Sequence, residues 1–274
     1  MPQDSINDAR FAFGENWRSF LARLDGARIA EAETALQWLV GRSRFDGLRF
    51  LDVGSGSGLS SLAARRLGAN VVSFDYDVQS VDCTTQLRAK FFPNDAAWRV
   101  ELGTILDRDY VAAIGQFDVV HAWGVLHHTG DLLRSIKNAA LLVVPGGLLI
   151  TALYRKTALC PLWAVEKRWY SRTSSSSQAK ARDLYTGLMR LAFAVTGRDF
   201  AAYVSNYRSN RGMDFIHDVH DWLGGYPYES IRPNDAAQMF CAIGFEEIRT
   251  KVRGNSIGVF GSGCDEYVYR KRRD

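Results

Sequence analysis

The chain has 274 residues, of which 47% are hydrophobic and 12% aromatic, enough apolar surface for a sizeable core in one or two domains. No apolar run approaches the roughly 20 residues that cross a bilayer, and the start MPQDSINDAR lacks the basic and then apolar order of a signal peptide, so we expect a cytoplasmic protein without a membrane partner. The net charge of +4 is mild and much of it lies in the last residues, Arg270 to Arg273, which argues against a nucleic-acid partner.

The N-terminal part of the chain has helical character. Apolar residues recur at helical spacing in Asn16–Leu24 and again in Ile29–Val40. We therefore predict that residues 1–45 form an N-terminal helical cap, packed on the edge of the domain that follows.

From about Arg49 to Tyr154, short apolar runs alternate with segments of helical length. This alternation is typical of βαβ units and a parallel sheet. The predicted strands are 49–54, 70–76, 98–103, 117–123 and 147–154, and the predicted helices are 59–67, 78–92 and 132–143. The last helix is predicted to stop at Pro145-Gly146-Gly147.

The pattern changes after Tyr154. Residues 155–230 contain a polar, serine-rich run and then helical spacing, and we interpret them as a helical insertion. A predicted helix (234–243) and two predicted strands (245–252 and 266–270) end the chain as an antiparallel hairpin. The expected organisation is one α/β core, residues 46–154 and 231–274, interrupted by the insertion.

Three glycines follow the first predicted strand, in LDVGSGSGLSS. Gly54, Gly56 and Gly58 lie where a strand passes into a helix, where glycine permits a tight turn and a close approach to a ligand. The dinucleotide fingerprint G-x-G-x-x-G would need glycine where Leu59 stands, and the phosphate loop G-x-x-x-x-G-K-[ST] is absent, so an oxidoreductase is disfavoured.

An acidic residue, Asp75, ends the second predicted strand. The ends of adjacent parallel strands share one crevice, and a carboxylate there can accept bonds from both hydroxyls of a ribose. The glycines and this carboxylate together indicate a nucleoside ligand with a charged tail that lacks phosphate. The alternative is a tight turn with a surface aspartate.

The region from Arg49 to Tyr154 resembles the class I S-adenosylmethionine-dependent methyltransferases, in particular small-molecule O-methyltransferases of the ubiquinone-biosynthesis type. LDVGSGSG resembles the first motif of that family, FDVVHAWGVLHHTGD (117–131) its fourth-strand motif, and VVPGGLLI (143–150) the stretch entering the fifth strand. The resemblance implies S-adenosylmethionine as the cofactor and a Rossmann-like, seven-stranded, mostly parallel sheet with a closing antiparallel hairpin.

The resemblance also implies which residues surround the cofactor. Asp52 and the glycine loop would surround its methionine part, Asp75 its ribose, and Thr104 and Ile105 its adenine. An N-terminal helix closes over the cofactor in several relatives, which would bring Asn16 or Trp17 near the methionine carboxylate. The full implied set is Asn16, Trp17, Asp52, Gly54, Ser55, Gly56, Gly58, Asp75, Tyr76, Thr104, Ile105, Ala122, Trp123 and His127.

All five histidines lie in two clusters, and these supply the candidate bases. His121 is expected to be buried in its strand, and His127 to shape the cofactor pocket. His128 follows the fourth strand at the ligand-bearing edge and is a catalytic candidate. His217 and His220 of the insertion are further candidates, because imidazole titrates near neutrality.

The insertion is predicted to form a lid over the substrate. Trp222, Tyr226 and Tyr228 would form its aromatic, substrate-binding wall. A solvated helix end is the alternative for the histidine segment. No metal site is expected, because the grouping His217-Asp218 and His220-Asp221 has no third cluster and the four cysteines lack C-x-x-C spacing.

The leading hypothesis from the sequence is methyl transfer to a small-molecule acceptor, with a hydroxyl as the expected acceptor group. One alternative is an RNA methyltransferase. Methyltransferases of adenine amino groups commonly carry [DN]-P-P-[YF] where this chain has Ala122 to Val125, so that subclass is disfavoured. The other alternative is a protein that binds S-adenosylmethionine without catalysis. Assembly as a homodimer is open.

Overall fold

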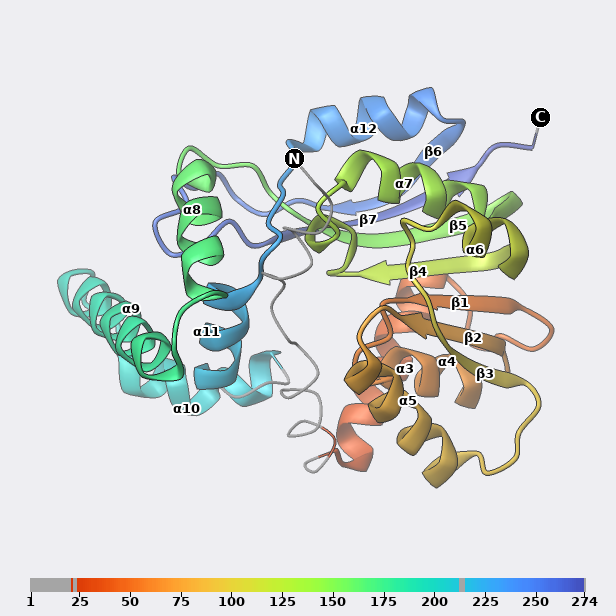
Figure 1. Ribbon diagram of the computed structural model, residues 1–274, viewed down its shortest axis with the longest axis horizontal. Helices are drawn as coiled ribbons and strands as arrows, with labels where there is room; N and C mark the ends of the chain where they lie inside the picture. Colours follow the sequence, from red (N-terminus) through yellow and green to blue (C-terminus); the bar gives the residue numbers. More distant parts are fainter. Residues whose placement is uncertain (1–20, 22–23, 212–214, 274) are drawn as a thin grey trace. The chain divides into compact units, whose positions relative to one another are not determined.

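The structure is a computed structural model that describes residues 21, 24–211 and 215–273. Seven strands form one sheet in the order β3-β2-β1-β4-β5-β7-β6 (Figure 1). The first five are parallel, and β7 is antiparallel to both β5 and β6. The strands are β1 (Arg49–Val53), β2 (Asn70–Asp75), β3 (Trp98–Leu102), β4 (Phe117–Trp123), β5 (Val143–Tyr154), β6 (Phe245–Lys251) and β7 (Cys264–Lys271). The predicted fold class, with its closing hairpin, is confirmed.

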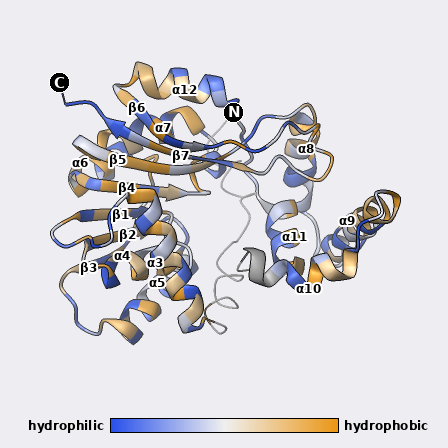
Figure 2. Cartoon of the chain, turned by 180° about the vertical axis from the view of Figure 1, so that it is seen from behind, coloured by the Kyte–Doolittle hydropathy of each residue, from blue (hydrophilic) through white to orange (hydrophobic). Residues whose placement is uncertain are grey.

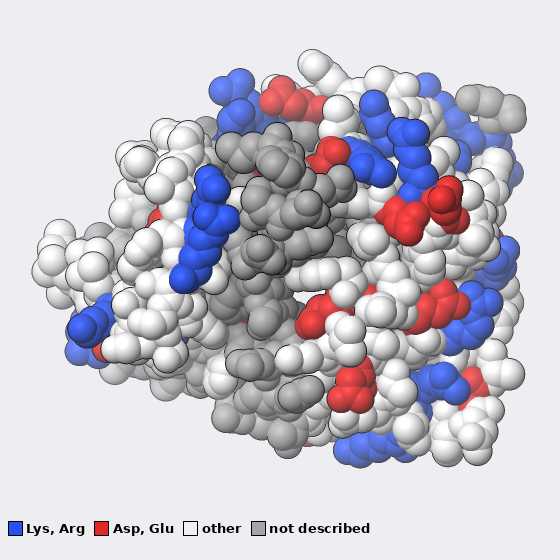
Figure 3. Space-filling model, viewed as in Figure 1, with Lys and Arg blue, Asp and Glu red and all other residues white. Residues whose placement is uncertain are grey.

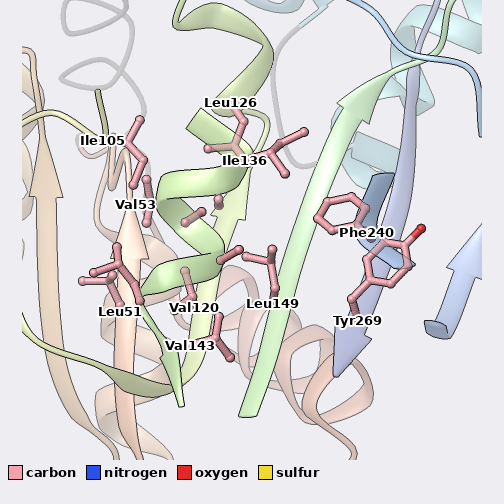
Figure 4. Packing of buried hydrophobic residues seen from close by; sticks show 14 of the residues in the cluster. Leu51, Val53, Ile105, Val120, Leu126, Ile136, Val143, Leu149, Phe240 and Tyr269 are labelled. Atoms are coloured by element: carbon pink, nitrogen blue, oxygen red, sulfur yellow. The ribbon is translucent and has the colours of Figure 1, made fainter. Parts of the chain in front are cut away.

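Helices cover both faces of the sheet, and each face has its own hydrophobic core. One core joins the sheet to α6 (Arg108–Ile114), α7 (Leu132–Leu141) and α12 (Pro233–Ala242), as Figure 4 shows around Ile136 and Phe240. The other joins it to α3 (Gly26–Val40), α4 (Leu59–Arg66) and α5 (Val78–Phe91). Strands buried on both faces are apolar along most of their length, as the colours of β4 and β5 show in Figure 2.

One predicted boundary is wrong. The helix expected over 132–143 ends at Leu141, and β5 begins at Val143, so Pro145, Gly146 and Gly147 lie inside the strand. The β4–β5 register shifts there, between Phe117 and Val119. A strand tolerates proline at such an irregularity, because the ladder hydrogen bond is already missing.

The described residues form two compact units. The sheet unit contains 21, 24–156, 229–255 and 263–273, and the insertion unit contains 157–211, 215–228 and 256–262. The insertion unit is helical: α8 (Cys160–Tyr170), α9 (Ser175–Val195), α10 (Phe200–Arg211) and α11 (Phe215–Gly224). Ser174 caps α9, so the serine-rich run belongs to the start of a helix and not to a loop. The sequence reading missed α6, α8 and α10.

Of the predicted N-terminal cap, α3 is described, and Ile29, Leu36 and Leu39 pack it onto the sheet unit. The helix expected over 16–24 lies almost entirely outside the described residues. No helix in the described part of the chain has the length and apolar character needed to cross a bilayer.

Candidate cofactor site

The loop between β1 and α4 carries the three glycines, all in the left-handed region, with φ of 68° at Gly54, 54° at Gly56 and 78° at Gly58. A Cβ on Gly54 would lie 2.6 Å from both γ carbons of Val125, and one on Gly58 would lie 3.0 Å from Thr84. Two of the glycines are therefore required by close packing of the loop on its own neighbours, in addition to any ligand.

Asp75 lies against this loop. Gly56 N–H donates to Asp75 Oδ2 at 3.0 Å, and Asp77 N–H donates to Asp75 Oδ1 at 3.0 Å. Each carboxylate oxygen has two lone pairs, so each keeps one acceptor position besides these backbone bonds. The strand-end carboxylate and the glycine loop thus form one hydrogen-bonded unit at the carboxyl edge of the sheet, where the strand order reverses beside β1.

The Asp75 carboxyl group is buried, with 7% of the residue exposed. Burial raises its pKa to about 6, and the hydrogen bonds from the Asp77 and Gly56 backbone partly oppose that shift. Asp75 is therefore an acceptor at neutral pH and gains a proton in mildly acidic solution.

Asp52 faces the interior of the sheet unit. Its Oδ1 lies 2.9 Å from His121 Nδ1, and its Oδ2 accepts a bond from Ser61 Oγ at 2.5 Å. Ser61 continues to Ser73 Oγ at 2.7 Å, to which Trp98 Nε1–H donates at 2.9 Å. This buried network joins β1, β2, β3, β4 and α4 next to the glycine loop. His121 is buried, as expected, and its ring also stacks on Trp123 at 5.9 Å.

The other residues implied for the cofactor follow β2, β3 and β4. The side chains of Ile105 and Ala122 are buried in the core, and their carbonyls accept bonds from Asn138 Nδ2 at 2.7 Å and from Thr151 Oγ1 at 3.0 Å. Tyr76 and Trp123 are 44% and 39% exposed at the ends of their strands. Thr104 Oγ1 accepts a bond from the Leu106 backbone at 3.3 Å.

His127 and His128 lie in a short 3-10 turn, η1 (Leu126–His128), after β4. Their ring centroids are 4.4 Å apart, and both rings contact Tyr154 at the end of β5, at 4.0 Å for His127 and 5.3 Å for His128. His127 is buried, whereas His128 is partly exposed. The turn brings two imidazoles and a phenol together at the carboxyl edge of the sheet.

His217 and His220 lie on α11 of the insertion unit, and both are partly exposed. His220 Nδ1 lies 2.6 Å from Tyr170 Oη, which also accepts a bond from Arg182 at 2.9 Å. Burial lowers the pKa of His220 to about 4, and the charges of Arg182 and His217 add to the effect. His220 is therefore neutral, and a weak proton acceptor, at pH 7.

The predicted aromatic wall has internal partners in the insertion unit. Tyr228 is buried, and its hydroxyl lies 3.1 Å from Cys160 Sγ and donates to Ser262 Oγ at 3.0 Å. Trp222 packs edge-on against Tyr228, whereas Tyr226 is partly exposed. Lys167, which the sequence reading missed, is buried with its Nζ 3.6 Å from the Trp222 ring centroid.

Two further predictions concern residues near the cofactor and metals. Asn16 and Trp17 lie outside the described residues.

In residues 24–211 and 215–273, no three His, Cys, Asp or Glu side chains are grouped to hold a metal ion. On the face seen in Figure 3, the described Lys and Arg side chains lie interspersed with Asp and Glu over the strands and helices of the sheet unit.

Sequence reasoning also missed Thr84 and Glu229. Thr84 Oγ1 lies 2.9 Å from Ser55 Oγ and holds the glycine loop against α5. Glu229 bonds the loop that contains the two histidines. No local pattern marks either residue, because each acts on a segment far away in the chain.

Known proteins resemble this chain in sequence. Residues 17–186 match the methyltransferase domain family. The ubiquinone biosynthesis O-methyltransferase of Caulobacter sp. (strain K31) is 32% identical over 120 residues, which are 43% of this chain and 45% of that protein. The chain spans about half the length of the curated relatives it matches.

Solved structures share the fold at low identity. The magnesium protoporphyrin IX methyltransferase ChlM of Synechocystis PCC 6803, with bound S-adenosylmethionine, superposes with a TM-score of 0.52 at 14% identity, over 89% of this chain and 79% of that one. The N-methyltransferase NodS of Bradyrhizobium japonicum WM9, in complex with S-adenosylhomocysteine, gives 0.53 at 13% identity, over 95% and 98%. The family match covers more than half of the chain and includes the glycine loop, Asp75 and the histidine turn, and this chain is therefore a member of the methyltransferase domain family.

Proposed function

We propose that this protein transfers a methyl group from S-adenosylmethionine to a hydroxyl of a small-molecule acceptor. The observation that carries the proposal is the bond between Gly56 N–H and the Asp75 carboxylate, which joins the two sequence motifs into one binding edge. The O-methyltransferase description of the curated relatives supports the acceptor type.

The residues at this edge fit the cofactor chemically. Asp75 keeps one acceptor position on each oxygen, which matches the two hydroxyls of a ribose. The start of α4, with its N–H donors, suits the carboxylate of the methionine part. The exposed ring of Tyr76 offers an apolar surface beside the ribose position. When bound, S-adenosylmethionine supplies an electrophilic methyl group on its sulfonium.

The chain itself would orient the acceptor and remove its proton. A hydroxyl acceptor needs a base within hydrogen-bond reach. The contact of the His128 ring with Tyr154 at the carboxyl edge supports the choice of His128 for that role. His220 is less suitable, because its lowered pKa makes it a poor acceptor of protons. In this proposal the insertion, with Trp222, Tyr226 and Tyr228, forms the lid that excludes water.

Calorimetric titration with S-adenosylmethionine and with S-adenosylhomocysteine tests the first half of the proposal. We expect binding of both, and weaker binding in Asp75→Ala. Asp82→Ala is the matched control, because Asp82 is an exposed carboxylate on the neighbouring α5. Absence of binding to the native protein would show that the edge serves another purpose.

A labelled-methyl assay tests the second half. The panel contains hydroxylated aromatics, matched amines and total RNA, and we expect label only in the hydroxylated compounds. Label in RNA or in amines alone would replace the acceptor assignment. Binding without any transfer across the panel would favour a non-catalytic role.

A further inference from the structure

The segment that leaves the insertion is bonded to the end of β5 and to the histidine turn. Ile231 N–H donates to the Tyr154 carbonyl at 3.0 Å, and Lys156 N–H donates to the Ile231 carbonyl at 3.0 Å. Glu229 N–H donates to the His127 carbonyl, also at 3.0 Å. The chain therefore returns from the insertion along the same strand end that packs against both imidazoles.

The Glu229 side chain bonds the other side of the histidine loop. Its Oε2 accepts a bond at 2.9 Å from the backbone of Leu132, 97 residues away in sequence and the first residue of α7. The Gly130 backbone bonds the same carboxylate. Glu229 is thus bonded through its backbone to His127 and through its side chain to Gly130 and to Leu132, at the start of α7.

The bonds within the loop do not connect it to the insertion. His128 N–H donates to the Val125 carbonyl at 2.9 Å, Thr129 Oγ1 to the Leu126 carbonyl at 2.8 Å, and Arg134 N–H to the local cap Asp131 at 3.0 Å. These contacts shape the turn and start the helix. Glu229 differs, because it ties the same loop to the segment through which the insertion rejoins the sheet unit.

The position of Glu229 has an electrostatic balance. Its carboxyl group is largely buried, which raises its pKa, and the neighbouring Asp131 raises it further. The hydrogen bonds from Leu132 and Gly130 oppose the shift, and the start of α7 favours negative charge. Burial and Asp131 therefore oppose the charged form of Glu229, whereas its hydrogen bonds to the loop favour that form.

We propose that Glu229 is a positioning residue that fixes His127 and His128 against Tyr154 and couples their placement to the exit of the insertion. The catalytic part of this inference rests on the proposed function, in which His128 is the base. The structural part, the placement of the two rings, stands independently of any activity.

The imidazole ring signals of His127 and His128 in two-dimensional NMR of the free protein test the structural part. We expect Glu229→Asp to shift both signals, because its shorter side chain does not reach Leu132. Glu229→Gln should shift them less, because its amide oxygen still accepts that bond. Asp25→Ala is the control: it removes a carboxylate cap from the start of α3 and should leave both signals unchanged.

Glu229→Ala should give the largest shift of the two ring signals. If that variant does not fold, the proposal is tested by whether Glu229→Asp shifts the signals more than Glu229→Gln does. Unmoved His127 and His128 signals in Glu229→Asp would overturn the proposal and leave Glu229 as a simple helix cap.

Activity then tests the catalytic part. In Glu229→Asp we expect kcat to fall at least tenfold, with partial rescue of kcat in Glu229→Gln. Shifted ring signals with undiminished kcat would overturn the catalytic part. Shifted signals in a protein that methylates no acceptor would instead contradict the proposed function and leave the positioning role intact.

Discussion

His121 Nδ1 lies 2.9 Å from Asp52 Oδ1, and the two residues are 69 positions apart in the sequence. Both side chains are almost fully buried, at 4% exposure each. Because a carboxylate only accepts, the imidazole is held with its proton on Nδ1. This pair links the end of β1 to β4 beside the glycine loop.

The first prediction concerns this pair. Asp52→Ala leaves the buried donors of His121 and Ser61 without their acceptor, and we expect the free energy of unfolding to fall by about 3 kcal/mol. Urea unfolding at pH 7 measures the change, with exposed Asp82→Ala as the control. A loss below about 1 kcal/mol, the scale of a single ordinary hydrogen bond, would show that the network contributes little to stability.

The second prediction concerns Gly54. Gly54→Ala places a methyl group 2.6 Å from Val125 at a positive φ, and we expect a loss of about 2 kcal/mol or more. Adding Val125→Ala should return part of that loss, because it removes the clashing carbons. Thermal unfolding of the single and double variants measures the coupling.

Gly26→Ala is the matched control for Gly54. Gly26 begins α3 and has no neighbouring atom within 4 Å of an added Cβ. Alanine there should be neutral or slightly stabilising. If Gly54→Ala is equally harmless, the packing role assigned to the glycine loop is wrong.

The third prediction is the affinity change in Asp75 variants. In the proposed site the Asp75 carboxylate accepts from the ribose hydroxyls, so we expect Asp75→Ala to weaken S-adenosylmethionine binding by about 1–3 kcal/mol. Calorimetry at pH 7.5 measures this change. Unchanged affinity would remove Asp75 from the cofactor site.

The fourth prediction is a pH dependence with two opposite signs. The pKa of Asp75 in the folded protein, about 6, lies above its ordinary value. Between the ordinary pKa and the raised pKa, the folded state holds more protons at Asp75 than the unfolded state does. Asp75 therefore contributes stability in acid, and this contribution is lost as the pH rises through about 6. In the proposed site the ionised carboxylate binds the ribose, so the affinity for the cofactor should instead fall as the pH drops from 7 to 5. Asp75→Asn should flatten this contribution to both curves.

The fifth prediction concerns Lys167. Burial lowers its pKa, and the charges of Glu166, Asp221 and Cys160 only partly oppose this shift. Between the lowered pKa of Lys167 in the folded protein, about 7, and its ordinary pKa of about 10.4, the unfolded chain holds more protons than the folded protein. The free energy of unfolding should therefore rise with pH across this range. Lys167→Met should remove this rise between pH 8 and 10. Glu166→Gln is included because burial also raises the pKa of Glu166; a rise that persists in Lys167→Met would contradict the assignment.

The sequence by itself determined the order and type of the sheet elements, and it predicted correctly that the glycine loop and Asp75 lie together at one edge of the sheet. Strands such as 117–123 and 70–75 contain short runs of β-branched and aromatic residues, and the three glycines follow a strand directly, so local spacing was sufficient. The start of β5 was predicted too late, because a proline and two glycines normally end an element, whereas here the register shift accommodates them.

The tertiary structure decided which side chains meet. Asp52 turns inward to His121, Thr84 holds the glycine loop, Tyr228 is bonded within the insertion unit, and Glu229 reaches Leu132 across 97 residues. The physical reason is that helix and strand periodicity depends on neighbours in sequence, whereas these contacts depend on packing between distant segments, which no local pattern specifies.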